Sequence, residues 1–187
     1  MTIEHRCRKQ INKAIRNDLR AEIVTPDKKL LDVYYNLHLQ TCRRNGIKPH
    51  PNQYFRTIQS TVAPAGLSKS CVVMLDNEVL AIHNFLIYKN CALYWTTAGS
   101  KKALQLCAND LGIWHAIKEL KQIGISYLDC GEAFPGIPHG KLKGLNDFKK
   151  SFGGELHPYF RGQTVYRPIT ESIMSIARHL LSRGATH

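Results

Sequence analysis

The feature that most constrains this chain of 187 residues is a short apolar run that stops at an acidic residue and enters a glycine-rich loop. Residues 125–131 have the sequence Ile-Ser-Tyr-Leu-Asp-Cys-Gly, which predicts a strand that ends at Asp129. Ligand clefts in open α/β sheets usually form at such strand ends. Glycine has no Cβ, so a glycine-rich loop can bring backbone N–H groups and positive charge close to an anion. The glycines and lysines of this predicted anion-binding loop are Gly131, Gly136, Gly140, Gly144, Lys141 and Lys143.

A second motif follows the loop. Residues 145–155 have the sequence Leu-Asn-Asp-Phe-Lys-Lys-Ser-Phe-Gly-Gly-Glu. They predict a short helix that carries Phe148 and Lys149 and ends at the glycine pair. The two motifs together place a helix with an aromatic ring and a positive charge directly after the predicted strand end.

This combination of a strand ending in Asp-x-Gly and a downstream Phe-Lys-x-x-Phe-Gly-Gly resembles the Fem family of peptidoglycan aminoacyltransferases and their acetyltransferase-like relatives in the GNAT superfamily. Residues 6–14 resemble the basic helix that enters the second half of such proteins, and residues 33–46 resemble their next helix. The resemblance covers the chain from about residue 5 to about residue 167. It implies acyl transfer, which is the chemistry of these families.

The order of predicted elements indicates an α/β (α+β) fold. Helices come first, followed by an antiparallel meander, another helix and further strands. This is the order of the GNAT fold, which is a mixed, mostly antiparallel sheet with splayed central strands flanked by helices. We expect residues 1–24 to form a basic N-terminal helix and linker, and residues 25–187 to form a single GNAT-like acyltransferase domain. The predicted helices cover residues 3–20, 27–45, a short stretch from 51, 103–122, 145–152 and 169–182, and the predicted strands cover 71–75, 79–88, 91–97, 125–129, 155–160 and 163–167.

The net charge of +12 is the compositional outlier, and it predicts attraction to a polyanion or to phosphate-rich ligands. The alternative is that the lysines merely keep the protein dispersed. No apolar run approaches the roughly 20 residues that span a bilayer, so we expect a cytoplasmic protein without a membrane span. The six cysteines are irregularly spaced and the nine histidines form no ligand motif, which predicts neither a disulfide framework nor a metal site.

The resemblance also implies a site. It places the opening between the splayed strands at residues 91–97 and 125–129, and it gives Lys149 the catalytic role of facing the reacting carbonyl. Phe148 would stack on a base of an aminoacyl-tRNA, although a helix phenylalanine is ordinarily core. A solvated lysine is the alternative for Lys149. The other residues expected on the donor side are Lys150, Asn146, Phe152, Gly153, Lys141 and Lys143, and those expected on the acceptor side are Tyr94, Trp95 and Thr96, which can equally be core.

The identity of the proton acceptor is left open by the sequence. Asp129 and Glu132 are the carboxylates nearest the predicted cleft, and either can accept the proton of the attacking amine if it is correctly placed. Asp129 can instead cap the following loop. His139 and His157 are alternatives, as is transfer without any protein base.

Two departures from the family pattern bear on the donor and the partners. The Gln/Arg-x-x-Gly-x-Gly/Ala signature of acetyl-CoA users is missing from residues 97–104, which read Thr-Ala-Gly-Ser-Lys-Lys-Ala-Leu. Fem proteins also have two GNAT-like domains, whereas this chain resembles the second. We therefore hypothesise that a second copy or a partner chain supplies the first, and a protein that is active as a monomer would exclude this.

The expected function is transfer of an acyl or aminoacyl group to an amine of a small molecule or peptide. The donor would be a co-substrate, aminoacyl-tRNA or acyl-CoA, with no permanently bound cofactor. A non-catalytic basic module that binds RNA or protein is the remaining alternative.

Overall fold

The computed structural model describes residues 3–160, 162, 164 and 174. The chain divides into two units, residues 1–155 and residues 156–187, and the architecture below is that of the first. Residues 155–160 form no regular element, so the strand expected there is wrong. The strand expected at 163–167 and the helix expected at 169–182 fall almost wholly outside the described residues.

Within the described residues, five strands form one sheet in the order β1-β2-β3-β4-β5. The first four are antiparallel neighbours, and β5 pairs with β4 in parallel. This mixed, mostly antiparallel sheet confirms the expected fold class. The strands are β1 (Leu19–Val24), β2 (Ser68–Leu75), β3 (Glu78–Tyr88), β4 (Cys91–Gly99) and β5 (Tyr127–Asp129).

Strand β1 lies where the sequence predicted the end of a helix and a linker. Helix α1 (His5–Arg16) stops earlier than expected, and Asp18 takes a positive φ of 57° before the strand begins. Leu19 is buried, whereas Arg20 and Glu22 are exposed. This alternation has the period of two that marks a strand, and the run of basic residues before it obscured the signal.

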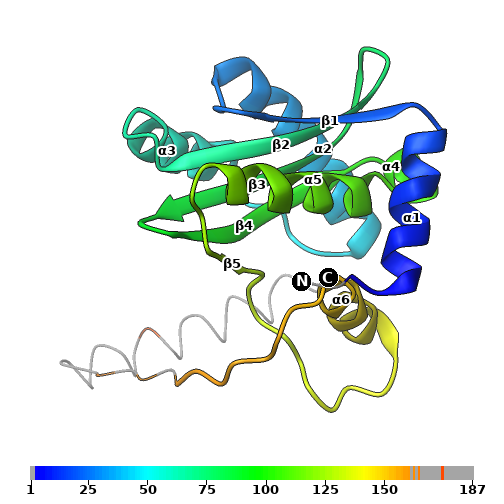
Figure 1. Cartoon of the computed structure of the whole chain (residues 1–187). Helices are drawn as coiled ribbons and strands as arrows, with labels where there is room; N and C mark the ends of the chain where they lie inside the picture. The colour runs from blue at the N-terminus through cyan, green and yellow to red at the C-terminus, as the bar shows by residue number, and fades with distance from the viewer. Residues whose placement is uncertain (1–2, 161, 163, 165–173, 175–187) are drawn as a thin grey trace, which may run out of the picture. The chain divides into compact units, whose positions relative to one another are not determined.

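The helices form two layers on the sheet (Figure 1). Helices α4 (Lys101–Gln105) and α5 (Ala108–Gln122) pack with α1 on one face, and α2 (Lys28–Asn45) and α3 (Asn52–Val62) pack on the other. Helix α6 (Gly140–Lys150) follows β5 and contributes to the first layer's core through Phe148. The helix predicted over 103–122 is two helices, because Cys107 takes a positive φ of 59° between them.

The sheet and α5 approach closely around a buried histidine. His83 on β3 is fully buried, and a Cβ added to Gly112 of α5 would lie 2.5 Å from its Nε2 and 2.8 Å from Val73 Cγ2. The Cys71 thiol donates a hydrogen bond to the Gly112 carbonyl at 3.2 Å. The missing side chain of Gly112 therefore sets the distance between α5 and the sheet.

This contact predicts opposite effects for two helix glycines. Gly112→Ala should lower the free energy of unfolding by about 1–3 kcal/mol, because the new methyl overpacks the core. Gly144→Ala on α6 meets nothing within 4 Å and should raise it by up to about 1 kcal/mol through helix propensity. Urea unfolding of both variants measures the difference, and equal effects would refute the packing argument.

The buried histidine also predicts a pH dependence of stability. Burial lowers the pKa of His83 to about 3, below the ordinary value of 6.5. The unfolded chain then binds the proton first, so the stabilisation present above pH 6.5 is lost as the pH falls toward 3, by at most about 1.4 kcal/mol per pH unit.

Replacing the imidazole isolates this contribution. His83→Gln should show a shallower fall in unfolding free energy between the two pH values than the unmodified chain. His38 and His115, whose pKa values burial also lowers, remain in both proteins and cancel in the comparison. Parallel pH curves for the two proteins would show that His83 does not titrate in this way.

Candidate active site

The sheet opens between β4 and β5. The two strands pair at three positions, Cys91 with Tyr127, Ala92 with Leu128 and Leu93 with Asp129. Strand β4 then continues to Gly99, and the described residues place no strand beside it on that edge. Backbone groups of β4 beyond Leu93 therefore face an opening, as the expected splayed strands require.

A bulge in β4 lies at the same point. Asn84 pairs with Thr96 and Phe85 with Tyr94, which leaves Trp95 as the extra residue. Trp95 packs with the core under α2 and α3, whereas Tyr94 packs with the core under α5. The three residues expected on the acceptor side are thus brought to the opening but divided between two faces.

The face toward α2 and α3 presents an aromatic wall. Trp95 lies with ring centroids 6.1 Å from both Tyr54 and Phe55, and the His50 ring stacks on Tyr54 at 4.7 Å. Tyr54 is partly exposed, so this wall reaches the surface. Neither Tyr54 nor His50 was predicted as a site residue, because the bulge that turns Trp95 toward them leaves no mark in the residue pattern.

Thr96 belongs to a buried polar chain on this face. Its hydroxyl accepts a hydrogen bond from Asn84 Nδ2 at 3.2 Å, and Asn84 Oδ1 accepts one from the Ser70 hydroxyl at 2.6 Å. Burial also raises the pKa of the nearby Tyr34 to about 12, which keeps that phenol neutral. The hydrogen bonds hold Thr96 as part of the sheet.

The opposite face presents a histidine with two hydroxyls. His83 Nδ1 lies 2.9 Å from the Tyr94 hydroxyl and 3.0 Å from Thr97 Oγ1. Burial raises the pKa of Tyr94. Since burial also holds His83 neutral, this group contributes oriented dipoles to the opening and no net charge.

Lys149 lies against the loop that leaves β5. Its ammonium donates a hydrogen bond to the Glu132 carbonyl at 2.7 Å, and a Cβ on Gly131 would lie 3.8 Å from Nζ. Burial lowers the pKa of Lys149, and Cys130, Asp129 and Glu132 oppose that shift. The side chain is half-buried, so it differs from a solvated helix lysine.

Asp129 holds the same loop in shape. Its Oδ1 accepts a hydrogen bond from the Gly131 N–H at 2.7 Å, and Gly131 takes a positive φ of 73°. This is the capping alternative that the sequence offered for Asp129. The carboxylate is nevertheless exposed, and Glu132 lies three residues further on.

A second side chain of helix α6 binds the same loop. Asn146 accepts a hydrogen bond from the Phe134 N–H at 2.9 Å and donates one to the Phe134 carbonyl at 2.7 Å. Asn146 and Lys149 are three residues apart and therefore lie on one face of the helix. On another face, Phe148 meets the buried Phe152 edge-on at 5.2 Å.

The remaining residues expected on the donor side are more peripheral. Lys143 pairs with Asp147 at 2.5 Å, and the Lys141 ammonium donates to the Asn45 carbonyl at 3.3 Å. Lys150 is exposed, and Gly153, three residues after the end of the helix, takes a positive φ of 82°. Asn146 binds the loop and Phe152 is buried, so both support the structure of the site. Phe148 is only partly buried.

Cys130, which was not predicted as a site residue, lies in the same loop. It is half-buried, burial raises its pKa, and the charge of Lys149 acts in the opposite direction. Cys130 also contributes to raising the pKa of Tyr94 on β4. Its position directly after Asp129 was the signal available in the sequence.

Side chains of α2 form hydrogen bonds with the turn between β4 and α4. Gly99 donates its N–H to Thr41 Oγ1 at 3.1 Å, and its carbonyl accepts from Arg44 Nη1 at 3.0 Å. The Ala103 N–H donates to Ser100 Oγ at 3.1 Å. Two backbone donors of this turn are therefore used inside the protein.

Two further observations concern the described part of the chain. It contains no group of three His, Cys, Asp or Glu side chains arranged to hold a metal ion. Among its helices, none combines the length and the apolar character needed to cross a bilayer.

A mixed sheet that opens between β4 and β5, with a bulge at the opening and helices on both faces, defines the acyltransferase class with the GNAT fold. The family model for the acetyltransferase (GNAT) domain matches residues 5–150. The chain belongs to this family of acyltransferases, as the sequence resemblance implied. A search of curated proteins finds no match.

Solved structures show the same fold at low sequence identity. The crystal structure of FemX is 15% identical with a TM-score of 0.72, over 81% of this chain and 54% of the FemX chain. L-PGS from Bacillus licheniformis is 15% identical with a TM-score of 0.59, over 80% of this chain and 50% of that one. An aminoglycoside acetyltransferase from an uncultured soil metagenomic sample, in complex with sisomicin, is 11% identical with a TM-score of 0.57, over 81% of this chain and 99% of that one. The chain thus spans about half the length of FemX and of L-PGS.

Proposed function

We propose that this chain is a GNAT/Fem-type enzyme that transfers an activated aminoacyl group from aminoacyl-tRNA to an amine of a small molecule or peptide. The observation that carries the proposal is the half-buried Lys149, whose ammonium binds the loop leaving β5 where the sheet opens. A cation at that position suits a reaction in which negative charge develops on an attacked carbonyl.

The chemistry requires few protein groups. The amine nitrogen attacks the ester carbonyl, a C–N bond forms, and the C–O bond to the ribose breaks as that oxygen takes up a proton. Lys149 and the backbone N–H groups of β4 beyond Leu93 would stabilise the intermediate oxyanion, and one such donor is worth roughly 3–4 kcal/mol. Asp129 and Glu132, which flank the anchored loop, are the proposed acceptors for the proton of the amine.

Three observations support aminoacyl-tRNA over acyl-CoA. Two N–H donors of the turn between β4 and α4 are already bound by Thr41 and Ser100, which leaves fewer for a pyrophosphate. The exposed side of α1 carries Arg8 and Lys9, which suit a polyanion. The beginning of α1 is also joined to the end of α6, because the Glu4 N–H donates to the Ser151 carbonyl at 2.9 Å.

Acyl-CoA is the second candidate donor. The matching family model describes an acetyltransferase domain, and the metagenomic aminoglycoside acetyltransferase is covered over 99% of its length.

The coverage of only 54% of FemX supports the proposal that a second copy or a partner chain completes the acceptor site.

The role of Lys149 is tested against its neighbour. Lys149→Ala should lower kcat by about 10²–10³, as loss of an oxyanion donor does, with little change in donor binding. Lys150→Ala removes the same charge from an exposed position and should leave kcat within about twofold of the unmodified value. Single-turnover kinetics with saturating donor measures both, and equal rates for Lys149→Ala and the unmodified protein would defeat the assignment.

The donor is tested by offering charged tRNA and acyl-CoA side by side. We expect transfer from charged tRNA, with binding that weakens steeply as salt rises. The double variant Arg8→Ala/Lys9→Ala should weaken tRNA binding about tenfold and leave the rate at saturation unchanged. Lys118→Ala/Lys121→Ala removes two exposed charges from α5 and is the matched control. Transfer from acyl-CoA alone would overturn the donor assignment and leave that of Lys149 standing.

A further inference from the structure

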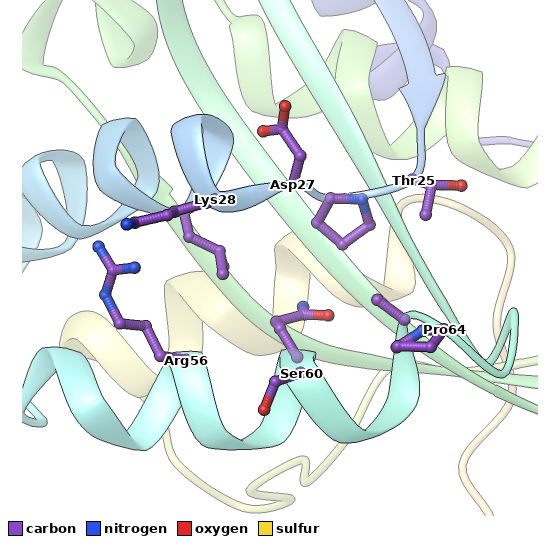
Figure 2. A pocket seen from close by; sticks show the side chains of 10 residues that line it. Thr25, Asp27, Lys28, Arg56, Ser60 and Pro64 are labelled. Carbon is purple, nitrogen blue, oxygen red and sulfur yellow. The ribbon is translucent and has the colours of Figure 1, made fainter.

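A pocket of about 500 Å³ lies between the beginning of α2 and helix α3 (Figure 2). It shares no lining residue with the candidate active site. Its volume falls within the range of about 300–1,000 Å³ that is usual for small-molecule sites. The acyl transfer proposed above gives this pocket no role.

The pocket wall contains a buried amide with an unused donor. Gln59 of α3 lines the pocket and is 2% exposed. Its Oε1 accepts a hydrogen bond from the Ser68 hydroxyl of β2 at 2.7 Å, whereas its Nε2 has no partner among the described residues. The NH₂ group is itself buried, so a small movement of the Gln59 side chain would be needed to present it to the pocket. A buried donor without a partner costs free energy, which a ligand oxygen would recover.

Positive charge converges on one end of the pocket. The side chains of Lys28 from α2 and Arg56 from α3 extend toward each other there (Figure 2). The Lys28 ammonium makes no hydrogen bond or ion pair with any described residue. The Thr25 hydroxyl accepts a hydrogen bond from the Lys69 ammonium at 3.1 Å, so its own proton remains available to a ligand.

The beginning of α2 adds to this positive electrostatic potential. The N–H groups of a helix's first turn point away from the helix without intrahelical partners and favour an anion. Here the first turn carries Lys28 and Lys29 and no acidic residue, which is the unfavourable arrangement for the helix dipole. The Asp27 carboxylate at the N-cap compensates for part of it, and a bound anion would add to that compensation.

The acidic residues nearby are already engaged. Asp27 caps α2 by accepting a hydrogen bond from the Leu30 N–H at 2.7 Å, and its carboxylate points away from α3 (Figure 2). Asp32 forms an ion pair with Arg56 and holds that guanidinium in place. Neither carboxylate forms an ion pair with Lys28.

The remaining lining residues are Asp27, Ser60 and the apolar Pro26, Leu31, Ala63 and Pro64, which form an apolar wall. We propose that this pocket binds a small organic oxyanion, a carboxylate or a phosphate monoester, with its charged group at Lys28 and Arg56 and its apolar body against this wall. Gln59 Nε2 donates to a ligand oxygen. The site is independent of the proposed transferase activity.

The test follows ¹H–¹⁵N resonances of the full chain during titration with four probes, which are hexanoate, phenyl phosphate, inorganic phosphate and the neutral hexanamide. We expect saturable shifts of the Gln59 side-chain NH₂ and of the amides of residues 28–31 with hexanoate or phenyl phosphate. Inorganic phosphate should bind more weakly because it has no apolar body, and hexanamide should bind more weakly because it has no charge. Which of the two organic anions binds more tightly identifies the head group.

Matched variants separate a built site from general attraction. Lys28→Gln should weaken binding about five- to tenfold, as loss of a charge-assisted contact does, whereas Lys29→Gln should leave it within about twofold. Both lysines lie in the same helical turn, but only Lys28 lines the pocket. Gln59→Leu should abolish the NH₂ signal and weaken binding, and if it fails to fold, the lysine pair alone decides. No saturable shift, equal losses in both lysine variants, or equal binding of hexanamide would each overturn the proposal.

Discussion

The candidate site depends on the short pairing between β4 and β5. Three paired positions fix the two strands in one sheet, and the strands separate immediately afterwards. A strand edge left in this way carries N–H and C=O groups that need partners. At Gly99 the partners are side chains of α2. Between Leu93 and Gly99 no described strand pairs with this edge, and the bulge at Trp95 turns side chains to both faces of that stretch. The opening is thus built by the backbone before any side chain acts on it.

Helix α6 places a positive charge, the Lys149 ammonium, beside this opening. Asn146 and Lys149, one turn apart, both bind backbone groups of the loop that leaves β5, while Phe148 and Phe152 attach the helix to the core. The position of the ammonium is therefore coupled to the shape of the loop. Asp129 fixes the same loop from its other end through Gly131. The motif at residues 145–155 is sufficient for this arrangement, although it follows the strand by some twenty residues. Its side chains bind different parts of the loop or pack against the core.

The meander of three strands was predictable because alternation and turn residues agree over residues 68–99, and helix α2 was predictable because Asp27 and Gly46 cap it. The same reasoning missed β1, whose alternation is short and follows a basic helix. It also missed the break at Cys107, where a single backbone angle divides a periodic run. For the site, the motif identified Lys149 and its loop. The division of Tyr94 from Trp95 was not predictable, since a bulge depends on the register between strands. The proximity of Gly112 to His83 depends in the same way on which elements pack together.

The distribution of charge bears on the size of the donor. The end of α6 lies beside the beginning of α1, because the backbones of the two segments are joined through Glu4 and Ser151. From that junction α1 extends over twelve residues, or about 18 Å at 1.5 Å per residue. This exceeds the screening length of about 8 Å at physiological salt, so the exposed charges of α1 do not act together on a compact ligand at the opening. They can act together on an extended polyanion that follows the helix, because each phosphate then lies within reach of its own lysine or arginine. A donor whose reactive end enters the opening while its backbone continues along α1 uses both sets of charges.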